Sequence, residues 1–102
     1  DTGCKLHGYL SDITRTYCFG EPSDKQKRLW NSEKKAQIAA FNTASIGNTC
    51  GAVDAAARES LQADGLGPDY TLPGLPHRTG HGIGMDIHER PYLVIRRSLL
   101  CH

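Results

Sequence analysis

The segment GHGIGMDIHERP at residues 80–91 constrains the fold most, because three glycines at alternating positions disfavour a regular helix. The segment carries His81 and His88, and His77 lies just before it. In an extended chain His77 and His81 share a parity and face one way, whereas His88 has the opposite parity. His88 can therefore join the other two only if the backbone bends or bulges at the glycines. A single histidine is most often a hydrogen-bonded structural residue, but three so close together favour a functional cluster.

The first residues of the chain predict a β-hairpin that brings two carboxylates together. Residues 1–20 are rich in strand-forming side chains, and a glycine marks a turn. If the loop is symmetric about Leu6 and His7, Asp1 lies directly opposite Asp12. Directly opposed residues have Cβ atoms about 4.5–5.5 Å apart. Carboxylates that close repel each other unless they share a proton or a cation.

Carboxylates and imidazoles together form a ligand set of hard oxygen and nitrogen atoms. Such a set suits Mn, Co, Zn or Fe(II) better than a thiolate-binding ion. Two carboxylates also suit a site in which one bridges two ions about 3.5–4 Å apart. Without the histidines, Asp1 and Asp12 would be interpreted as a turn cap and a surface acid. The HExxH pattern of one class of zinc peptidases does not occur in the sequence.

The middle of the chain predicts two helices followed by a loop. Residues 24–46 have a good N-cap at Ser23 and a stop at Gly47, and residues 52–63 form the second helix. Residues 64–76 are dense in glycine and proline and predict a loop. Apolar positions recur at helical spacing and predict core-facing stripes: Leu29, Trp30, Ala36, Ala40, Phe41 and Ala44, then Val53, Ala57 and Leu61. The expected fold class is α+β: a hairpin, two helices and a strand-like histidine segment.

Composition excludes several classes of function. The chain has 102 residues, which is one domain at most, and 12 basic against 11 acidic residues give a net charge of +1. This balance gives no electrostatic case for binding nucleic acid or an anionic membrane. No apolar run approaches the roughly 20 residues of a membrane span. The four cysteines form no CxxC motif, so free thiols and a cytoplasmic location are expected.

Two long motifs, DTGCKLHGYLSDITRT and HRTGHGIGMDIHERPYLV, resemble those of the pita-bread metallopeptidases. This family includes Xaa-Pro dipeptidases (prolidases), Xaa-Pro aminopeptidases and methionine aminopeptidases. The SDITRT motif and the HRTGHGIG…HERPYLV pattern are more similar to the Xaa-Pro-cleaving branch than to the methionine branch. The likeness runs from Asp1 to about Val94. Residues 1–102 are therefore expected to be part of a catalytic domain of the pita-bread fold, with residues 94–102 departing from the family pattern.

The resemblance implies a site for two divalent metal ions, with manganese favoured and cobalt or zinc as alternatives. By this likeness Asp1 and His81 are metal ligands, and Asp12 is a ligand that bridges the two ions. His77 and His88 are implied to contact the substrate or the tetrahedral intermediate without binding metal. The glycines around His81 would let the backbone pass close to the ions.

The implied activity is hydrolysis of Xaa-Pro bonds in dipeptides or longer peptides by a metal-activated water. Family members have two further glutamate ligands downstream; Glu89 belongs to the HERP motif and is not one of them. The 102-residue chain alone is therefore expected to be an incomplete, inactive fragment. Its exposed edges favour self-association, with a homodimer as the candidate assembly. Alternatives on this fold are a creatine amidinohydrolase-like hydrolase and a non-catalytic binding module, but such relatives usually lack the ligand residues retained here.

Overall fold

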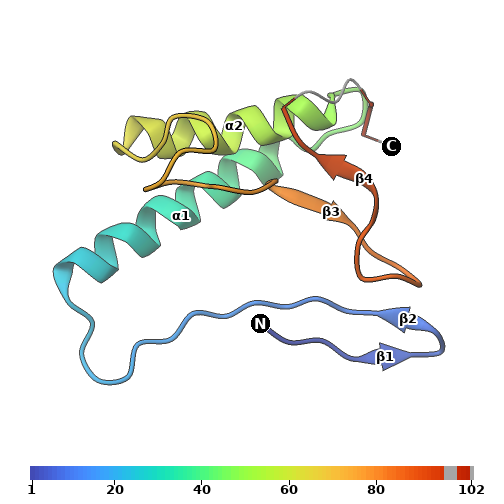
Figure 1. Cartoon of the computed structure of the whole chain (residues 1–102), viewed down its shortest axis with the longest axis horizontal. Coiled ribbons are helices and arrows are strands. Elements are labelled where there is room, and N and C mark those ends of the chain that lie inside the picture. The colour runs from blue at the N-terminus through green and yellow to red at the C-terminus, as the bar shows by residue number, and fades with distance from the viewer. Residues whose placement is uncertain (96–98, 102) are drawn as a thin grey trace.

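A computed structural model describes residues 1–95 and 99–101 of the chain. It contains two helices and two separate two-stranded antiparallel sheets, which confirms the expected α+β class (Figure 1). In chain order the elements are β1 (Lys5–Leu6), β2 (Tyr9–Leu10), α1 (Asp24–Thr43), α2 (Cys50–Ala63), β3 (Gly80–Gly82) and β4 (Glu89–Leu93). The helices pack on each other, and β4 contacts α2. In the part of the chain that the structure describes, neither helix has the length and apolar character that crossing a membrane requires.

Side-chain caps set the ends of α1. Ser23 is the N-cap: its Oγ accepts from the Gln26 N–H at 3.3 Å, and its own N–H donates to Gln26 Oε1 at 2.8 Å. The predicted start of the helix is thus confirmed. The predicted end at residue 46 is wrong, because the helix ends at Thr43. The Asn48 side-chain amide donates to the Thr43 carbonyl at 2.8 Å, so it satisfies a carbonyl that a longer helix would have paired.

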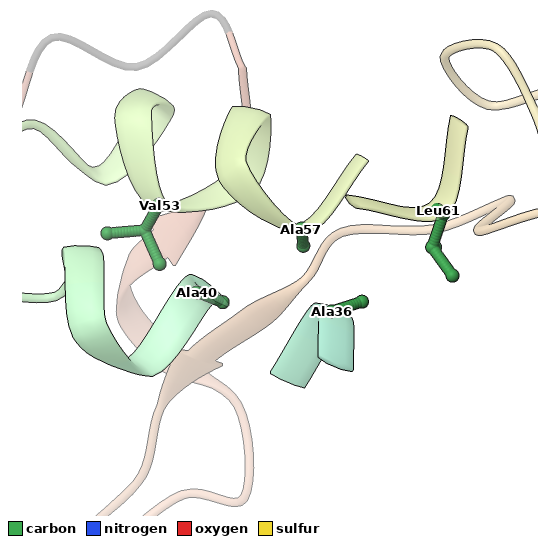
Figure 2. Close-up of a cluster of buried hydrophobic side chains, with 5 residues drawn as sticks. All are labelled: Ala36, Ala40, Val53, Ala57 and Leu61. Atoms are coloured by element: carbon green, nitrogen blue, oxygen red, sulfur yellow. The ribbon is translucent and has the colours of Figure 1, made fainter. Parts of the chain in front are cut away.

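The core is a seam of small side chains between the two helices (Figure 2). Val53, Ala57 and Leu61 of α2 are buried, as predicted, and they face Ala36 and Ala40 of α1. The rest of the predicted α1 stripe is wrong: Leu29, Trp30, Phe41 and Ala44 are exposed. Trp30 and Phe41 lie about 100–120° around the helix from the line through Ala36 and Ala40, at 100° per residue. Two alanines therefore set the contact line, and the aromatic side chains lie off it.

A buried ion pair connects α2 to the loop that follows it. Arg58 binds Asp54 one helical turn earlier, with Nε–Oδ2 and Nη2–Oδ1 distances of 3.0 and 3.2 Å. The side chains are 6% and 0% exposed. A buried ion pair is tolerated only when its remaining hydrogen-bonding capacity is used. Arg58 meets this condition by donating to the carbonyls of Asp69, Leu75 and His77 at 2.6–2.7 Å.

The Asp54 carboxylate also fixes the residue that precedes β3. Oδ1 accepts from the backbone N–H of Thr79 at 3.1 Å and from its hydroxyl at 2.6 Å. Tyr70 donates to Oδ2 at 3.4 Å, and its ring stacks on the Arg58 guanidinium with 3.7 Å to the centroid. Burial raises the pKa of Asp54, but hydrogen bonds from Arg58 and Thr79 and the Arg58 charge lower it below its ordinary value. We call Asp54 and Arg58 with these partners the α2 clamp.

We expect Arg58→Ala to destabilise the chain strongly, because it leaves the Asp54 charge buried without its partner. Removing one member of a buried pair typically costs about 3–5 kcal/mol. Urea unfolding followed by far-UV circular dichroism measures the loss. The matched control is Lys35→Ala, which breaks the ion pair of an exposed lysine with Asp64 at 3.4 Å and should change stability little. A similar small effect for both variants would contradict the clamp.

Candidate functional site

The register of the first hairpin differs from the predicted one. His7 and Gly8 have φ angles of +50° and +90° and form a two-residue turn. The turn is thus one residue later than symmetry about Leu6 and His7 requires. Cross-strand partners are Lys5 with Leu10, Leu6 with Tyr9, and Thr2 with Ile13. In this register Asp1 is opposite Thr14, so the prediction that Asp1 lies directly opposite Asp12 is wrong.

Asp1 and Asp12 nevertheless lie on one face of the hairpin. Asp12 is two residues before Thr14, the residue opposite Asp1, so Asp1 and Asp12 are diagonal neighbours. Diagonal neighbours are about 7–8 Å apart at Cα, which is within reach of two carboxylates that converge on one site. Thr14 donates from its hydroxyl to Asp1 Oδ1 at 3.1 Å. Gly3 is opposite Asp12, and a side chain at Gly3 would collide with the carbonyl oxygen of Ser11. The close approach of the two strands of this hairpin therefore requires glycine at position 3.

The histidine segment forms a second hairpin. Gly80 pairs with Leu93, His81 with Tyr92 and Gly82 with Glu89, with a bulge between His81 and Gly82. The chain reverses between β3 and β4, and His88 returns beside His81. The two rings meet edge to face, with centroids 4.4 Å apart. The bend that His88 needs to reach His81 is thus supplied by a full chain reversal.

Each of the two ring nitrogens of His81 faces a different oxygen atom. Nδ1 lies 2.9 Å from the carbonyl oxygen of Gly82, which can only accept, so Nδ1 carries the hydrogen. Nε2 lies 3.6 Å from Asp12 Oδ2. In a neutral ring with Nδ1–H, Nε2 presents a lone pair. In that form, lone-pair atoms of His81 and Asp12 face each other.

One backbone hydrogen bond joins the two hairpins beside this contact. The Leu10 N–H of β2 donates to the carbonyl of Gly84, in the β3–β4 loop, at 2.8 Å. Next to this bond is an open hollow of about 460 Å³ whose lining includes Asp1, Asp12 and His88. Three of the five predicted site residues thus line one hollow, and His81 reaches it through its contact with Asp12.

His77 lies apart from this group. Its Nδ1 is 2.8 Å from the Arg78 carbonyl, and its own carbonyl is held by Arg58. It lines a groove shared with residues of both helices. The catalytic role of His77 therefore stays a prediction. In the described residues, no three His, Cys, Asp or Glu side chains are close enough together to hold a metal ion on their own.

Two glycines of the GHGIG segment are explained by the hairpin itself. A Cβ at Gly82 would lie 2.5 Å from the Arg90 carbonyl oxygen. A Cβ at Gly84 would lie 2.8 Å from a carboxylate oxygen of Glu89. Glu89 uses its other oxygen to accept the Asp86 N–H at 2.8 Å, which closes the loop. At Gly82 the close approach that demands glycine is thus to the backbone of the same hairpin, whereas at Gly84 the neighbour is the end of a flexible side chain.

Sequence reasoning missed Asp54 and Arg58, which position the site without lining it. Their signal is an acid and a base four residues apart within VDAAAR, a stretch otherwise made of small apolar residues. That spacing is equally typical of exposed pairs on a helix surface, so it identifies the pair without showing that it is buried. Thr79 then carries their effect to the start of β3.

Comparison with known proteins agrees with these features. A model of metallopeptidase family M24 matches residues 1–99. The Xaa-Pro dipeptidase of Lactobacillus helveticus is 40% identical over 100 residues, which are 98% of this chain and 26% of that protein. The probable dipeptidase PepE of Mycobacterium tuberculosis is 44% identical over 93 residues, which are 91% of this chain and 24% of that protein.

Solved structures give the same result. The prolidase of Thermococcus sibiricus superposes with a TM-score of 0.85 at 38% identity, over 96% of this chain and 25% of that one. The dipeptidase PepE of Mycobacterium ulcerans gives a TM-score of 0.86 at 42% identity, over 96% of this chain and 25% of that one. The chain thus spans about a quarter of the length of its relatives and forms part of a pita-bread fold. With both motifs in place on two joined hairpins, the chain belongs to metallopeptidase family M24.

Proposed function

We propose that this chain supplies three of the five ligands of the two-metal site of an Xaa-Pro peptidase. Asp1, Asp12 and His81 are the proposed metal ligands, and His88 is the proposed substrate contact. The observation that carries the proposal is the 3.6 Å approach of His81 Nε2 to Asp12 Oδ2, with Nδ1 occupied by the Gly82 carbonyl. Metal-binding histidines commonly donate their other ring N–H to a carbonyl in this way.

The residues present fit divalent ions in chemistry, and the one pair of His81 and Asp12 also fits in spacing. Nitrogen and oxygen ligands bind such ions at about 2.0–2.2 Å, so two ligands of one ion lie at most about 4.4 Å apart. The 3.6 Å separation falls inside that limit. Membership of a metallopeptidase family supports metal dependence, and the oxygen-rich set favours manganese, with cobalt or zinc as alternatives. When bound, such ions would lower the pKa of a water nucleophile and polarise the scissile carbonyl.

We propose that His88 acts on the substrate, and its surroundings support this role. Its ring lies edge to face against His81 and lines the hollow with both carboxylates. An imidazole there can donate a hydrogen bond to the developing oxyanion or a proton to the leaving nitrogen. Proline nitrogen is a poor leaving group, so this proton matters for Xaa-Pro bonds. We propose His77 as a second substrate contact, which would require it to act from the neighbouring groove.

The substrate class proposed is proline-containing dipeptides and oligopeptides. The names of the relatives, Xaa-Pro dipeptidase and prolidase, support it. Retention of Asp1, Asp12 and His81 favours this function over a creatine amidinohydrolase-like hydrolase or a binding module. The spacing of the four cysteines, which includes no CxxC motif, supports a cytoplasmic location. A homodimer stays the proposed assembly.

A chimera tests the ligand assignment. Residues 1–95 of this chain replace the matching quarter of the Thermococcus sibiricus prolidase, which supplies the remainder of the domain. We expect the chimera to bind divalent metal and to hydrolyse an Xaa-Pro dipeptide. Asp12→Asn in the chimera should lose both, because the amide keeps the shape but removes the charge that attracts the ions. Metal content by atomic emission and hydrolysis by product release are the two readouts.

The matched variant is His88→Ala in the same chimera. It should keep its metal and lose activity mainly in kcat, by about 10²–10⁴-fold, because it removes a proton or hydrogen-bond donor. If metal content falls in step with activity, His88 is a ligand and its role here is wrong. An active, metal-loaded Asp12→Asn chimera would contradict the whole ligand set.

We expect the 102-residue chain alone to be inactive and to bind metal weakly. It offers two carboxylates and one imidazole, and two dications about 3.5–4 Å apart need more negative charge to offset their repulsion. Calorimetric titration with Mn²⁺ or Co²⁺, beside an assay of Gly-Pro hydrolysis with a metal-only blank, measures both properties. Tight binding of two ions, or turnover above the blank, would show that the short chain completes the site in another way.

A further inference from the structure

The start of α2 and the last described residues of the chain form a short antiparallel contact. Thr49 bridges Leu100. The Cys50 N–H donates to the Leu99 carbonyl, and the Cys101 N–H donates to the Asn48 carbonyl, both at 2.8 Å. In this register Cys50 and Cys101 flank the bridge on one face as diagonal neighbours. Two cysteines far apart in sequence are thus brought to neighbouring positions on one face of this contact.

The surroundings of the two thiols differ. Cys50 is fully buried, whereas Cys101 is half-buried at the margin of the helix core. Burial first, and then the charge and hydrogen bonding of the adjacent Cys101 thiol, raise the pKa of Cys50. Cys4 and Cys18 are exposed on the N-terminal segment, where their thiols contact the Ser11 hydroxyl and the Phe19 carbonyl. Cys50 and Cys101, by contrast, are brought together by a register of backbone hydrogen bonds.

We propose that Cys50 and Cys101 are a redox-convertible dithiol that closes to an intramolecular disulfide when the chain meets a small-molecule disulfide such as glutathione disulfide. The half-exposed Cys101 reacts first. Its thiolate attacks one sulfur of the oxidant, which releases one glutathione thiolate and leaves a mixed disulfide on Cys101. Cys50 then loses its proton and attacks the Cys101 sulfur, which releases the second glutathione. The protein is oxidised by two electrons, and the oxidant becomes two glutathiones.

The disulfide would tie the C-terminal segment to the first residue of α2. Asp54 lies one helical turn further along that helix, so the bond would brace the end of α2 that carries the clamp. Loop closure between residues this far apart in sequence also stabilises a chain by restricting its unfolded state. The inference is independent of the peptidase proposal, because neither cysteine lines the hollow between the hairpins.

The test uses the 102-residue chain with Cys4→Ser and Cys18→Ser, so that only the pair can react. Incubation with glutathione disulfide should give a monomer about 2 Da lighter than the reduced chain, with a peptide that links Cys50 to Cys101. The oxidised form should melt at least about 5 °C higher than the reduced form. The ratio of intramolecular disulfide to mixed disulfide should be at least about 100-fold higher in native buffer than in concentrated urea, because folding holds the thiols together.

The control variant adds Cys101→Ser to the same background. It should form no internal disulfide and show no rise in melting temperature after the same treatment. The proposal is overturned if the two-cysteine chain keeps a mixed disulfide on Cys101, forms disulfide-linked dimers instead, or stays reduced. An equal product ratio in buffer and in urea would overturn it as well, because the fold would then contribute nothing.

Discussion

The buried ion pair between Asp54 and Arg58 is the contact on which the rest of the structure depends. The 64–79 segment has no helix or strand of its own, so its backbone carbonyls need partners from elsewhere. Arg58 supplies them to Asp69, Leu75 and His77 from a single guanidinium. Only arginine presents several donors in one rigid plane, so lysine could not replace it. The pair converts an irregular loop into a fixed lead-in to the histidine hairpin.

The α2 clamp positions the candidate site through a series of contacts between neighbouring residues. Asp54 holds Thr79, and β3 begins at the next residue, so the first residue of the histidine hairpin is set from α2. A bulge follows His81, and Nε2 of its ring lies 3.6 Å from Asp12 Oδ2 of the first hairpin. The bond between Leu10 and Gly84 fixes the two hairpins to each other. An isolated two-stranded hairpin is marginally stable, so the convergence of Asp12 and His81 requires all of these contacts.

The sequence predicted the parts of the fold that depend on local chemistry. Ser23 as a helix cap, the apolar face of α2 and the two motifs were all recognisable from neighbouring residues. The register of the first hairpin was not, because a His-Gly turn with positive φ at both residues differs by one position from a symmetric loop. The exposure of Trp30 and Phe41 was missed because periodicity marks apolar residues without showing which of them meet a partner.

The structure brings some of the predicted site residues together, but by a different geometry from the predicted one, and their roles stay predictions. Asp12, His81 and His88 converge, but the prediction treated residues 80–91 as one strand with a bend, whereas the structure has a hairpin. Asp54 and Arg58 escaped notice because a charged pair on a helix usually faces solvent. Burial of that pair depends on the loop that wraps it, which is a tertiary property that no local pattern contains.

The tautomer of His81 is the property that depends most closely on the proposed ligand set, because the contacts of the two hairpins together orient its ring. Long-range ¹H–¹⁵N correlation spectra of the 102-residue chain, with His81→Gln to assign the signals, report which ring nitrogen carries hydrogen. With the ring neutral, the account predicts hydrogen on Nδ1 and a bare Nε2 directed at Asp12. Hydrogen on Nε2 with a bare Nδ1 would contradict it, because Nε2 would then donate to the carboxylate and have no lone pair for a metal ion.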